Sequence, residues 1–345
     1  MQAAHITPPL LQVEDLEVRF QGKTETVYAV NGVSFNVYSG ETFGLVGESG
    51  CGKSQTCRSI LRLIKPPGRI TGGHIRYQGE DLIALSDRAM RRVRGREISV
   101  IFQEPMTSLN PVMKIRKQIY EVFDGMNLSE EEKERRALEL MNQVGIPDPK
   151  ARLDEYAHQY SGGMRQRVMI AIALGARPKL LLADEPTTAL DVTIQDQIMK
   201  LINKLKSELS MSMILVTHDL AVIAQMCDRV AVMYAGLVVE MTDTMTLFSH
   251  PRHPYTYALM KSLPNKASSG AVSGGTQSVD PLETIEGAPP NLSSPIPGCP
   301  FAPRCRYAKP LCVAQRPPLA DVMYGHAARC HFPEVTETFR GILDQ

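Results

Sequence analysis

A glycine-rich stretch near the start of the chain has the residue types and spacing of a phosphate-binding loop (P-loop). It fits the pattern G-x-x-x-x-G-K-S/T, and its residues are Gly47, Glu48, Ser49, Gly50, Cys51, Gly52, Lys53 and Ser54. The glycines let successive backbone N–H groups turn toward a phosphate chain, and a following helix adds partial positive charge. Lys53 would reach the β- and γ-phosphates, and the Ser54 hydroxyl would bind Mg²⁺. The stretch therefore predicts a site for a nucleoside triphosphate.

The segments on either side of this loop support that interpretation. Residues 42–46 form an apolar run that predicts a buried strand, and residues 55–64 have the pattern of a helix. Strand, glycine loop and helix in this order are the context in which the motif is meaningful. The alternative, a chance glycine-rich turn, does not explain these flanks.

Two acidic residues follow a second apolar run. Residues 180–183 have no polar face, as expected of a strand in a parallel sheet covered on both sides, and Asp184 and Glu185 come next. The aspartate suits a place near Mg²⁺, and the glutamate could orient or deprotonate an attacking water. An Asp-Glu pair alone would more often be a solvated strand end, but a P-loop upstream favours the catalytic interpretation.

A second set of small residues also opens a helix. Ser161, Gly162 and Gly163 leave free N–H groups at the helix start, which is another candidate phosphate cradle. One nucleotide does not need two cradles. The pair is explained if each chain offers one cradle to its own ATP and the other to the ATP of a partner chain.

The composition of the chain excludes several classes of protein. Its 345 residues carry 38 basic and 37 acidic side chains, so charge gives no reason to expect nucleic acid or anionic lipid as a partner. Apolar runs stay shorter than the about 18 residues of a membrane span, and residues 1–9 do not resemble a signal peptide. ATP use points to the cytosol, where the seven cysteines would not form a disulfide framework.

The remaining pattern predicts an α/β fold. Residues 11–20 and 30–37 alternate as strands of an antiparallel layer, with a short strand at 74–77. Residues 98–102, 180–185, 213–217 and 230–233 have the pattern of buried strands in a mainly parallel sheet. Residues 104–176 look helical, with Ser129 and Glu132 forming a capping box before one helix.

The chain changes character near residue 265. Residues 265–279 are rich in glycine and serine and predict a flexible linker, and residues 280–345 are rich in proline and cysteine. We therefore expect a first domain at 9–264, with its helical subdomain at about 104–176, and a small irregular C-terminal region.

Taken together, these motifs resemble those of the ATP-binding subunits of ABC transporters over about residues 9–263. The shared residues, in chain order, are the P-loop followed by Gln55, the Q-loop Gln103, the signature Ser161, Gly162, Gly163 and Met164, the Walker B pair Asp184 and Glu185, the D-loop Asp191, and the switch residue His218. The signature departs from the usual Leu-Ser-Gly-Gly-Gln at Tyr160 and Met164, but its Ser-Gly-Gly core is intact.

This resemblance implies a fold and roles. The fold would be a P-loop ABC ATPase cassette with a RecA-like parallel core, an antiparallel β layer and a helical subdomain. Glu185 would be the general base, His218 would contact the γ-phosphate, and Gln103 would contact Mg²⁺ and report to membrane subunits. Phe20 best matches the aromatic residue that stacks on adenine. Tyr28 is a weaker candidate, and a plain strand aromatic is the alternative for Phe20.

The C-terminal part resembles one branch of the family. Residues 250–264, 287–292 and 298–300 are similar to the extension of oligopeptide- and dipeptide-permease ATPases. The tail also holds four cysteines, Cys299, Cys305, Cys312 and Cys330. Their spacing leaves open zinc, an iron–sulfur cluster or free thiols. The resemblance implies a [4Fe-4S] cluster of structural role, with His326 and His331 as fallback ligands. Cys51, Cys57 and Cys227 are expected to be plain small side chains.

The resemblance also implies partners. These are a homologous second ATPase subunit in a heterodimer, two transmembrane permease subunits and, in the whole complex, an extracytoplasmic peptide-binding protein, at the cytoplasmic face of the cell membrane. Similar ATPases serve nickel and glutathione importers. Two other classes stay open: a soluble ABC ATPase without membrane partners, and a regulatory ATPase whose cysteine tail senses metal or redox state.

Overall fold

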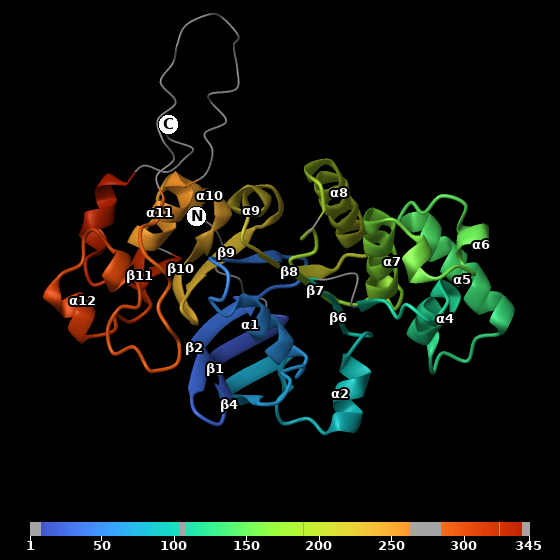
Figure 1. Cartoon of the computed structure of the whole chain (residues 1–345), viewed down its shortest axis with the longest axis horizontal. Coiled ribbons are helices and arrows are strands. Elements are labelled where there is room, and N and C mark those ends of the chain that lie inside the picture. The colour runs from blue at the N-terminus through green and yellow to red at the C-terminus, as the bar shows by residue number, and fades with distance from the viewer. Residues whose placement is uncertain (1–7, 104–107, 189, 263–283, 324, 340–345) are drawn as a thin grey trace, which may run out of the picture.

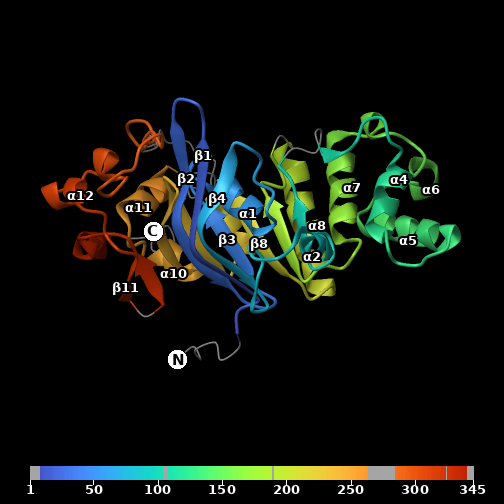
Figure 2. The same cartoon turned by 90° about the horizontal axis from the view of Figure 1, so that it is seen from below.

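The computed structural model describes residues 8–103, 108–188, 190–262, 284–323 and 325–339. Strands occupy the middle of the molecule, helices α4 to α7 lie at one end, and the C-terminal elements lie at the opposite end (Figure 1). The view from below shows the same order along the long axis (Figure 2).

The central sheet has eight strands among the described residues, in the order β11-β12-β10-β9-β3-β8-β7-β6. Its core strands pair in parallel. They are β3 (Thr42–Val46), β6 (Ile98–Ile101), β7 (Leu180–Asp184), β8 (Ser212–Thr217) and β9 (Arg229–Tyr234). Every residue of β3, β7 and β8 is buried, since elements cover both faces of the sheet. The predicted parallel core is confirmed.

A second, antiparallel sheet forms the other layer, in the order β2-β1-β4-β5. Its strands are β1 (Leu11–Gln21), β2 (Thr26–Val37), β4 (Gly68–Tyr77) and β5 (Glu80–Asp81). The predicted antiparallel layer is correct, but β4 is much longer than the four residues expected. Two adjacent glycines obscured it: Gly73 has φ +86°, and a Cβ there would lie 2.4 Å from the carbonyl oxygen of Glu14, where the β1–β4 register shifts.

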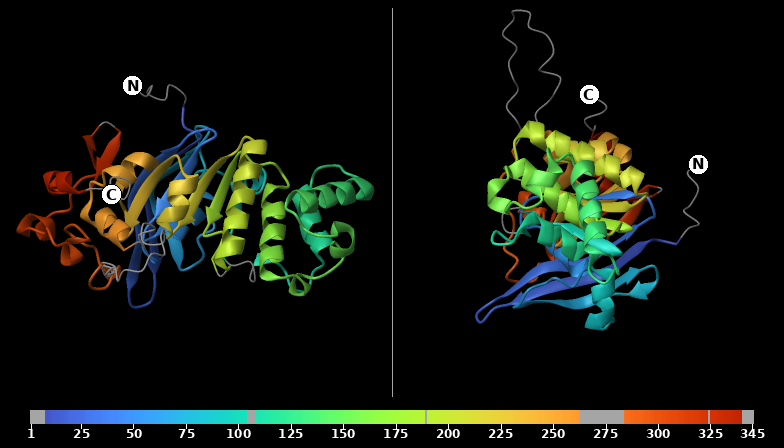
Figure 3. Two further views of the ribbon diagram at one scale, coloured as in Figure 1. Left: turned by 90° about the horizontal axis from the view of Figure 1, so that it is seen from above. Right: turned by 90° about the vertical axis from the view of Figure 1, so that its right-hand side faces the viewer.

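The helices between β6 and β7 form the end of the molecule that faces the viewer in the right panel of Figure 3. They are α4 (Ile115–Tyr120), α5 (Glu130–Gln143), α6 (Pro149–Arg152) and α7 (Gly162–Leu174), with 3-10 turns at Glu121–Phe123 and Ala157–Gln159. The Ser129 hydroxyl accepts from the Glu132 N–H at 3.2 Å, as predicted. The Glu132 carboxylate instead pairs with Arg136 at 3.6 Å. Residues 104–107 of the expected helical region lie outside the described residues.

The other helices of the cassette border the two sheets. They are α1 (Lys53–Ile60), α2 (Asp87–Val93), α8 (Val192–Glu208), α9 (Leu220–Met226), α10 (Thr244–Ser249) and α11 (Pro254–Lys261). Helix α1 begins at Lys53, directly after the glycine loop, so the strand–loop–helix context predicted for the motif is present.

The C-terminal region is more regular than expected. It contains η4 (Ala302–Arg304), α12 (Pro310–Ala314), β11 (Ala320–Met323), β12 (His326–Ala328) and η5 (Pro333–Thr338). Its neighbour in the central sheet is β10 (Leu237–Asp243) of the cassette. Strand β12 pairs with β10 and with β11, so the tail extends the central sheet by two strands. The tail has the few, short elements that the sequence predicts, but two of them join the central sheet, which the sequence did not predict. The predicted linker at 265–279 lies outside the described residues.

Candidate functional site

A cavity of about 400 Å³ opens beside the glycine loop at the ends of the parallel strands. It is lined by Phe20, Val27, Ala29, Ser49, Gly50, Gly52, Lys53, Ser54, Gln55, Arg58, Gln103, Glu185 and Leu292. Seven of these are predicted site residues from the loop, α1 and β1, and Gln103 and Glu185 come from the ends of β6 and β7. The cavity thus joins the two halves of the predicted site.

Two loop glycines are required by close backbone contacts. A Cβ on Gly47 would lie 2.1 Å from the carbonyl oxygen of Met233 on β9, and one on Gly52 would lie 2.5 Å from that of Ala29 on β2. Both have positive φ, +153° and +103°. The loop is therefore wedged between two strands, and this fixes where its N–H groups point.

Lys53 lies folded into the loop. Its Nζ donates to the carbonyl oxygens of Gly47 at 2.7 Å and Glu48 at 2.9 Å, and the Cys51 sulfur is 3.7 Å away. Burial raises the pKa of the Cys51 thiol, so it is a neutral small side chain, as expected. These partners are uncharged, which leaves the charge of the amine available to phosphates.

Ser54 and Asp184 meet at the bottom of the site. The Ser54 hydroxyl donates to Asp184 Oδ1 at 2.7 Å, although the two residues are 130 positions apart. Burial raises the pKa of the Asp184 carboxyl, and the hydrogen bond from Ser54 partly offsets this. A hydroxyl beside a buried carboxylate is a donor set that suits Mg²⁺.

The three predicted catalytic residues come together around one carboxylate. Glu185 Oε2 accepts from Gln103 Nε2 at 3.0 Å, and His218 Nδ1 lies 3.4 Å from Oε1. Thr188, which the sequence did not single out, also donates to Oε2 at 2.9 Å. Glu185 has φ +47°, a left-handed conformation that is uncommon for glutamate. The backbone turn after β7 thus aims this side chain at the cavity.

The predicted signature and D-loop residues lie outside this cavity. Ser161 caps α7 and accepts from the Met164 N–H at 3.3 Å, with Gly162 exposed beside it. Asp191 caps α8 by accepting from the Ile194 N–H at 2.9 Å. Of the described residues, none from the signature or Asp191 lines the nucleotide cavity.

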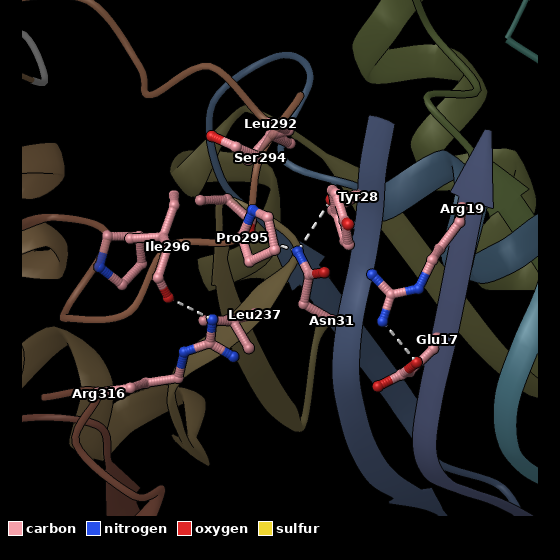
Figure 4. A pocket seen from close by; sticks show the side chains of 12 residues that line it. Glu17, Arg19, Tyr28, Asn31, Leu237, Leu292, Ser294, Pro295, Ile296 and Arg316 are labelled. Atoms are coloured by element: carbon pink, nitrogen blue, oxygen red, sulfur yellow. Dashed lines mark hydrogen bonds and ion pairs between the residues drawn. The ribbon is translucent and has the colours of Figure 1, made fainter. Parts of the chain in front are cut away.

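The two aromatic residues that could stack on the adenine base, Phe20 and Tyr28, lie in different cavities. Phe20 lines the nucleotide cavity, whereas Tyr28 lies under the Arg19 guanidinium at 4.3 Å and borders a second cavity of about 170 Å³. Figure 4 shows this second cavity between strands β1 and β2 and the tail segment from Leu292 to Ile296. Leu292 lines both cavities, and sequence reasoning gave it no role in the site.

The four tail cysteines, Cys299, Cys305, Cys312 and Cys330, line one small cavity. Burial raises the pKa of the Cys299 and Cys330 thiols, and that of Cys305 to about 11. Backbone N–H groups of Phe301, Tyr307 and Phe332 are directed at these sulfurs and partly offset the effect of burial. Within the described ranges, however, no three cysteine, histidine or carboxylate residues are grouped closely enough to hold a metal ion. The expected metal-binding tail is not supported by this arrangement.

The two fallback histidines lie in different places. His331 lines the thiol cavity and places Nε2 2.8 Å from the carbonyl oxygen of Gln315. His326 is buried against Glu240, with Nε2 2.8 Å from Oε1. Of the two predicted fallback ligands beside Cys330, His331 therefore lines the thiol cavity and His326 does not.

Comparison with known proteins gives a consistent result. A family model described as ABC transporter matches residues 30–188, and one described as oligopeptide/dipeptide transporter, C-terminal region, matches residues 239–312. The oligopeptide transport ATP-binding protein OppD of Bacillus subtilis (strain 168) is 49% identical over 319 residues, covering 92% of this chain and 87% of that protein. The dipeptide transport ATP-binding protein DppD of Escherichia coli (strain K12) is 46% identical, covering 94% and 97%.

Solved structures agree on the fold. The dimeric ATP-binding cassette MJ0796, in a post-hydrolysis state bound to ADP and Pi, superposes with a TM-score of 0.60 at 28% identity. The match covers 68% of this chain and 98% of that one. With the P-loop, the Walker B pair and the C-terminal match all present, the chain belongs to the ABC transporter family, in the branch of oligopeptide and dipeptide transport ATP-binding proteins.

Proposed function

We propose that this chain is the ATP-hydrolysing subunit of an ABC importer for oligopeptides or dipeptides, acting at the cytoplasmic face of the cell membrane. The observation that carries the proposal is the meeting of the P-loop with Gln103, Asp184, Glu185 and His218 at and beside one cavity. The names of the relatives support the substrate class.

Binding uses the loop and its flanks. The phosphates of ATP occupy the loop, and its adenine base lies beside Phe20. Lys53 exchanges its hydrogen bonds to loop carbonyls for bonds to phosphate oxygens. Ser54, Gln103 and Asp184 would hold Mg²⁺, which neutralises charge on the phosphates when bound.

Hydrolysis depends on Glu185. Its carboxylate accepts a proton from the attacking water, while Gln103 and Thr188 orient it by donating to Oε2. His218 lies on the other side of the same carboxylate and would contact the γ-phosphate. His218 is well exposed, so the site is open to a closing partner.

That partner is a second cassette. The signature residues do not reach the chain's own cavity, so they serve the ATP of the facing subunit, and the facing subunit's Ser-Gly-Gly completes this one. A homologous but different chain is the expected partner. Closure around two ATP molecules would drive two transmembrane permease subunits, supplied with substrate by an extracytoplasmic peptide-binding protein.

Among the helices that the structure describes, none has the length and apolarity to cross a bilayer. The helices between β6 and β7, together with the segment after Gln103, are the proposed contact with a permease subunit. Part of that segment, residues 104–107, is outside the described residues.

The tail cysteines are proposed to hold a [4Fe-4S] cluster of structural role. All four line one cavity, and N–H groups directed at sulfur are the kind of hydrogen bonds that such clusters receive. A single zinc ion would draw the sulfurs to about 3.8 Å of one another, given Zn–S bonds of about 2.3 Å. A [4Fe-4S] cluster holds its cysteines through several irons and does not require the four sulfurs to bind one ion.

The function is tested with Glu185→Gln. Removal of the proton acceptor should lower ATP turnover by about 10²- to 10⁴-fold while ATP affinity is retained. Uptake of a labelled dipeptide and a labelled oligopeptide in cells lacking the gene should return with wild type and not with the variant. Near-normal hydrolysis by Glu185→Gln would remove this residue from its role. Restored nickel or glutathione uptake without peptide uptake would overturn the substrate class.

The cluster is tested on protein purified without oxygen. About four irons and four sulfides per chain, with a broad visible absorption band, are expected. One zinc per chain, or four free thiols in the anaerobic protein, would contradict the cluster and leave the ATPase function standing.

A further inference from the structure

The C-terminal region contacts the P-loop through Arg304, the residue before Cys305. Arg304 Nη1 donates to Glu48 Oε2 at 2.7 Å and Nη2 donates to Oε1 at 3.1 Å. The fork of the guanidinium thus meets both oxygens of one carboxylate, which is the strong geometry for this pair. The Arg304 side chain is only 6% exposed and that of Glu48 24%, so the contact is largely shielded from water.

The main chain of Glu48 is held as well. Its N–H donates to the Tyr255 hydroxyl at 2.9 Å, and its carbonyl oxygen accepts from Lys53 Nζ at 2.9 Å. The Tyr234 hydroxyl accepts from Arg304 Nη1 at 3.2 Å. Glu48, whose carbonyl oxygen holds Lys53, is therefore fixed directly by Arg304 and Tyr255, and Tyr234 helps to hold Arg304.

These tyrosines are packed against the tail. The Phe301 ring lies 5.4 Å from Tyr234 and 5.3 Å from Tyr255 between ring centres. Phe301 begins the turn that ends at Arg304, and both residues lie between Cys299 and Cys305. One packed unit therefore runs from the thiol cavity to the P-loop.

The Arg304 contact also matters for charge. Glu48 lies in a loop whose other groups attract anions, and an unpaired carboxylate there would repel the phosphates. Arg304 cancels that charge without entering the cavity itself. Its bonds to Glu48 raise the pKa of Arg304, so it is charged at any pH at which the protein works.

The tail reaches the opposite end of the site too. Leu292 lines the nucleotide cavity with Phe20 and Val27, and its carbonyl oxygen accepts from the Tyr28 N–H at 2.8 Å. Figure 4 shows Leu292 next to Tyr28, with Ser294 and Pro295 continuing away from the strands. The C-terminal region thus touches the site at the phosphate end and at the end beside Phe20.

We propose that the C-terminal region is a working part of the ATP site, in which Arg304 is a positioning residue that neutralises Glu48 and fixes the loop holding Lys53. Leu292 forms the wall of the pocket beside Phe20. This proposal rests on the proposed function in so far as ATP is taken as the ligand. It gives the C-terminal region a role in ATP binding, in addition to the structural role proposed for its cysteines.

The test compares Arg304→Met with Arg316→Met. Arg316 is another partly buried tail arginine, but its hydrogen bond goes to the carbonyl oxygen of Ile296 within the tail. The affinity of the full-length chain for a fluorescent ATP analogue is measured, with Lys53→Ala as the non-binding reference and thermal unfolding as the measure of folding. Arg304→Met should bind about tenfold more weakly, which corresponds to about 1.4 kcal/mol, and Arg316→Met should bind as wild type.

Repeating the measurement in the Glu48→Gln background distinguishes loss of the Arg304–Glu48 ion pair from a general disturbance of the structure. Without the carboxylate, Arg304→Met should cost markedly less affinity than it does in the wild-type background. An equal loss in both backgrounds, an equal loss in Arg316→Met, or wild-type affinity in Arg304→Met would each overturn the proposal while the ATPase function stands. Failure of the wild-type chain to bind the analogue would instead overturn the proposed function.

Discussion

At the scale of single residues, the loop glycines differ in why they are needed. A Cβ on Gly47 would lie 2.1 Å from a backbone oxygen of β9. Gly50 is also at positive φ (+80°), but a Cβ there would meet no described atom within 4 Å. Gly47→Ala should therefore destabilise the nucleotide-free protein by more than about 3 kcal/mol, and Gly50→Ala by only about 1–2 kcal/mol.

Thermal unfolding of the two glycine variants without nucleotide measures this difference. A similar drop in both would mean that left-handed backbone strain, not the contact with Met233, sets the requirement at Gly47. Both variants should bind ATP poorly, so affinity alone does not separate the two causes.

The sequence was most informative at this scale. Residue type and order are enough to predict Lys53, Ser54, Asp184 and Glu185, because each lies in a short run with its own chemistry, whereas Gln103 is predicted only by the resemblance to the ABC family. Thr188 and Leu292 carry no such signal, since a threonine after a strand or a leucine in a proline-rich segment is ordinary. Only the fold brings them to Glu185 and to Phe20.

At the scale of elements, helix α11 begins at a buried histidine. His253 Nδ1 accepts from the Tyr255 N–H at 3.1 Å and so caps the helix. Burial lowers the pKa of His253 to about 3, despite a backbone hydrogen bond with Arg329 that acts the other way. The folded protein therefore keeps this ring neutral, while the unfolded chain protonates it below about pH 6.5.

This makes folding stability depend on pH. The unfolded state binds the extra proton, so the free energy of unfolding should decrease by about 1.4 kcal/mol per pH unit as pH falls from about 6.5 toward 3. In His253→Asn, which keeps a capping acceptor but does not titrate, this part of the slope should vanish. Denaturant unfolding at several pH values compares the slopes, and an unchanged slope in the variant would exclude His253 as the cause.

The sequence predicted some helices and strands well and others poorly. Buried strands such as β7 and β8 stand out because parallel strands have no polar face. Strand β4 was predicted too short, since Gly72 and Gly73 lower strand propensity, while shifts of register beside them keep the pairing with β1. The tail hairpin was missed because β11 and β12 are short and gain their order from the edge of β10, which sequence periodicity does not report.

At the scale of the whole molecule, the exposed position of the signature residues at the start of α7 leads to a prediction about assembly. Helix α7 presents Gly162 on the surface, where the nearest described neighbour of a Cβ would be Leu190 at an ordinary 3.8 Å. A glutamate at this position suits a helix start and should not disturb the chain. It would nevertheless place a carboxylate where the γ-phosphate of a facing subunit's ATP is expected.

Gly162→Glu should therefore separate binding from assembly. The isolated chain should keep its melting temperature and its ATP affinity, but ATP should no longer drive association with the second ATPase subunit. Sedimentation velocity of the two subunits mixed with ATP, in a Glu185→Gln background that prevents turnover, measures this, and Gly162→Ala is the matched control. If Gly162→Glu weakened ATP binding by the isolated chain, the signature would belong to the chain's own site. Under the two proposals, Arg304 acts on the chain's own nucleotide and Gly162 on that of a facing subunit, so Arg304→Met should change affinity and Gly162→Glu only assembly.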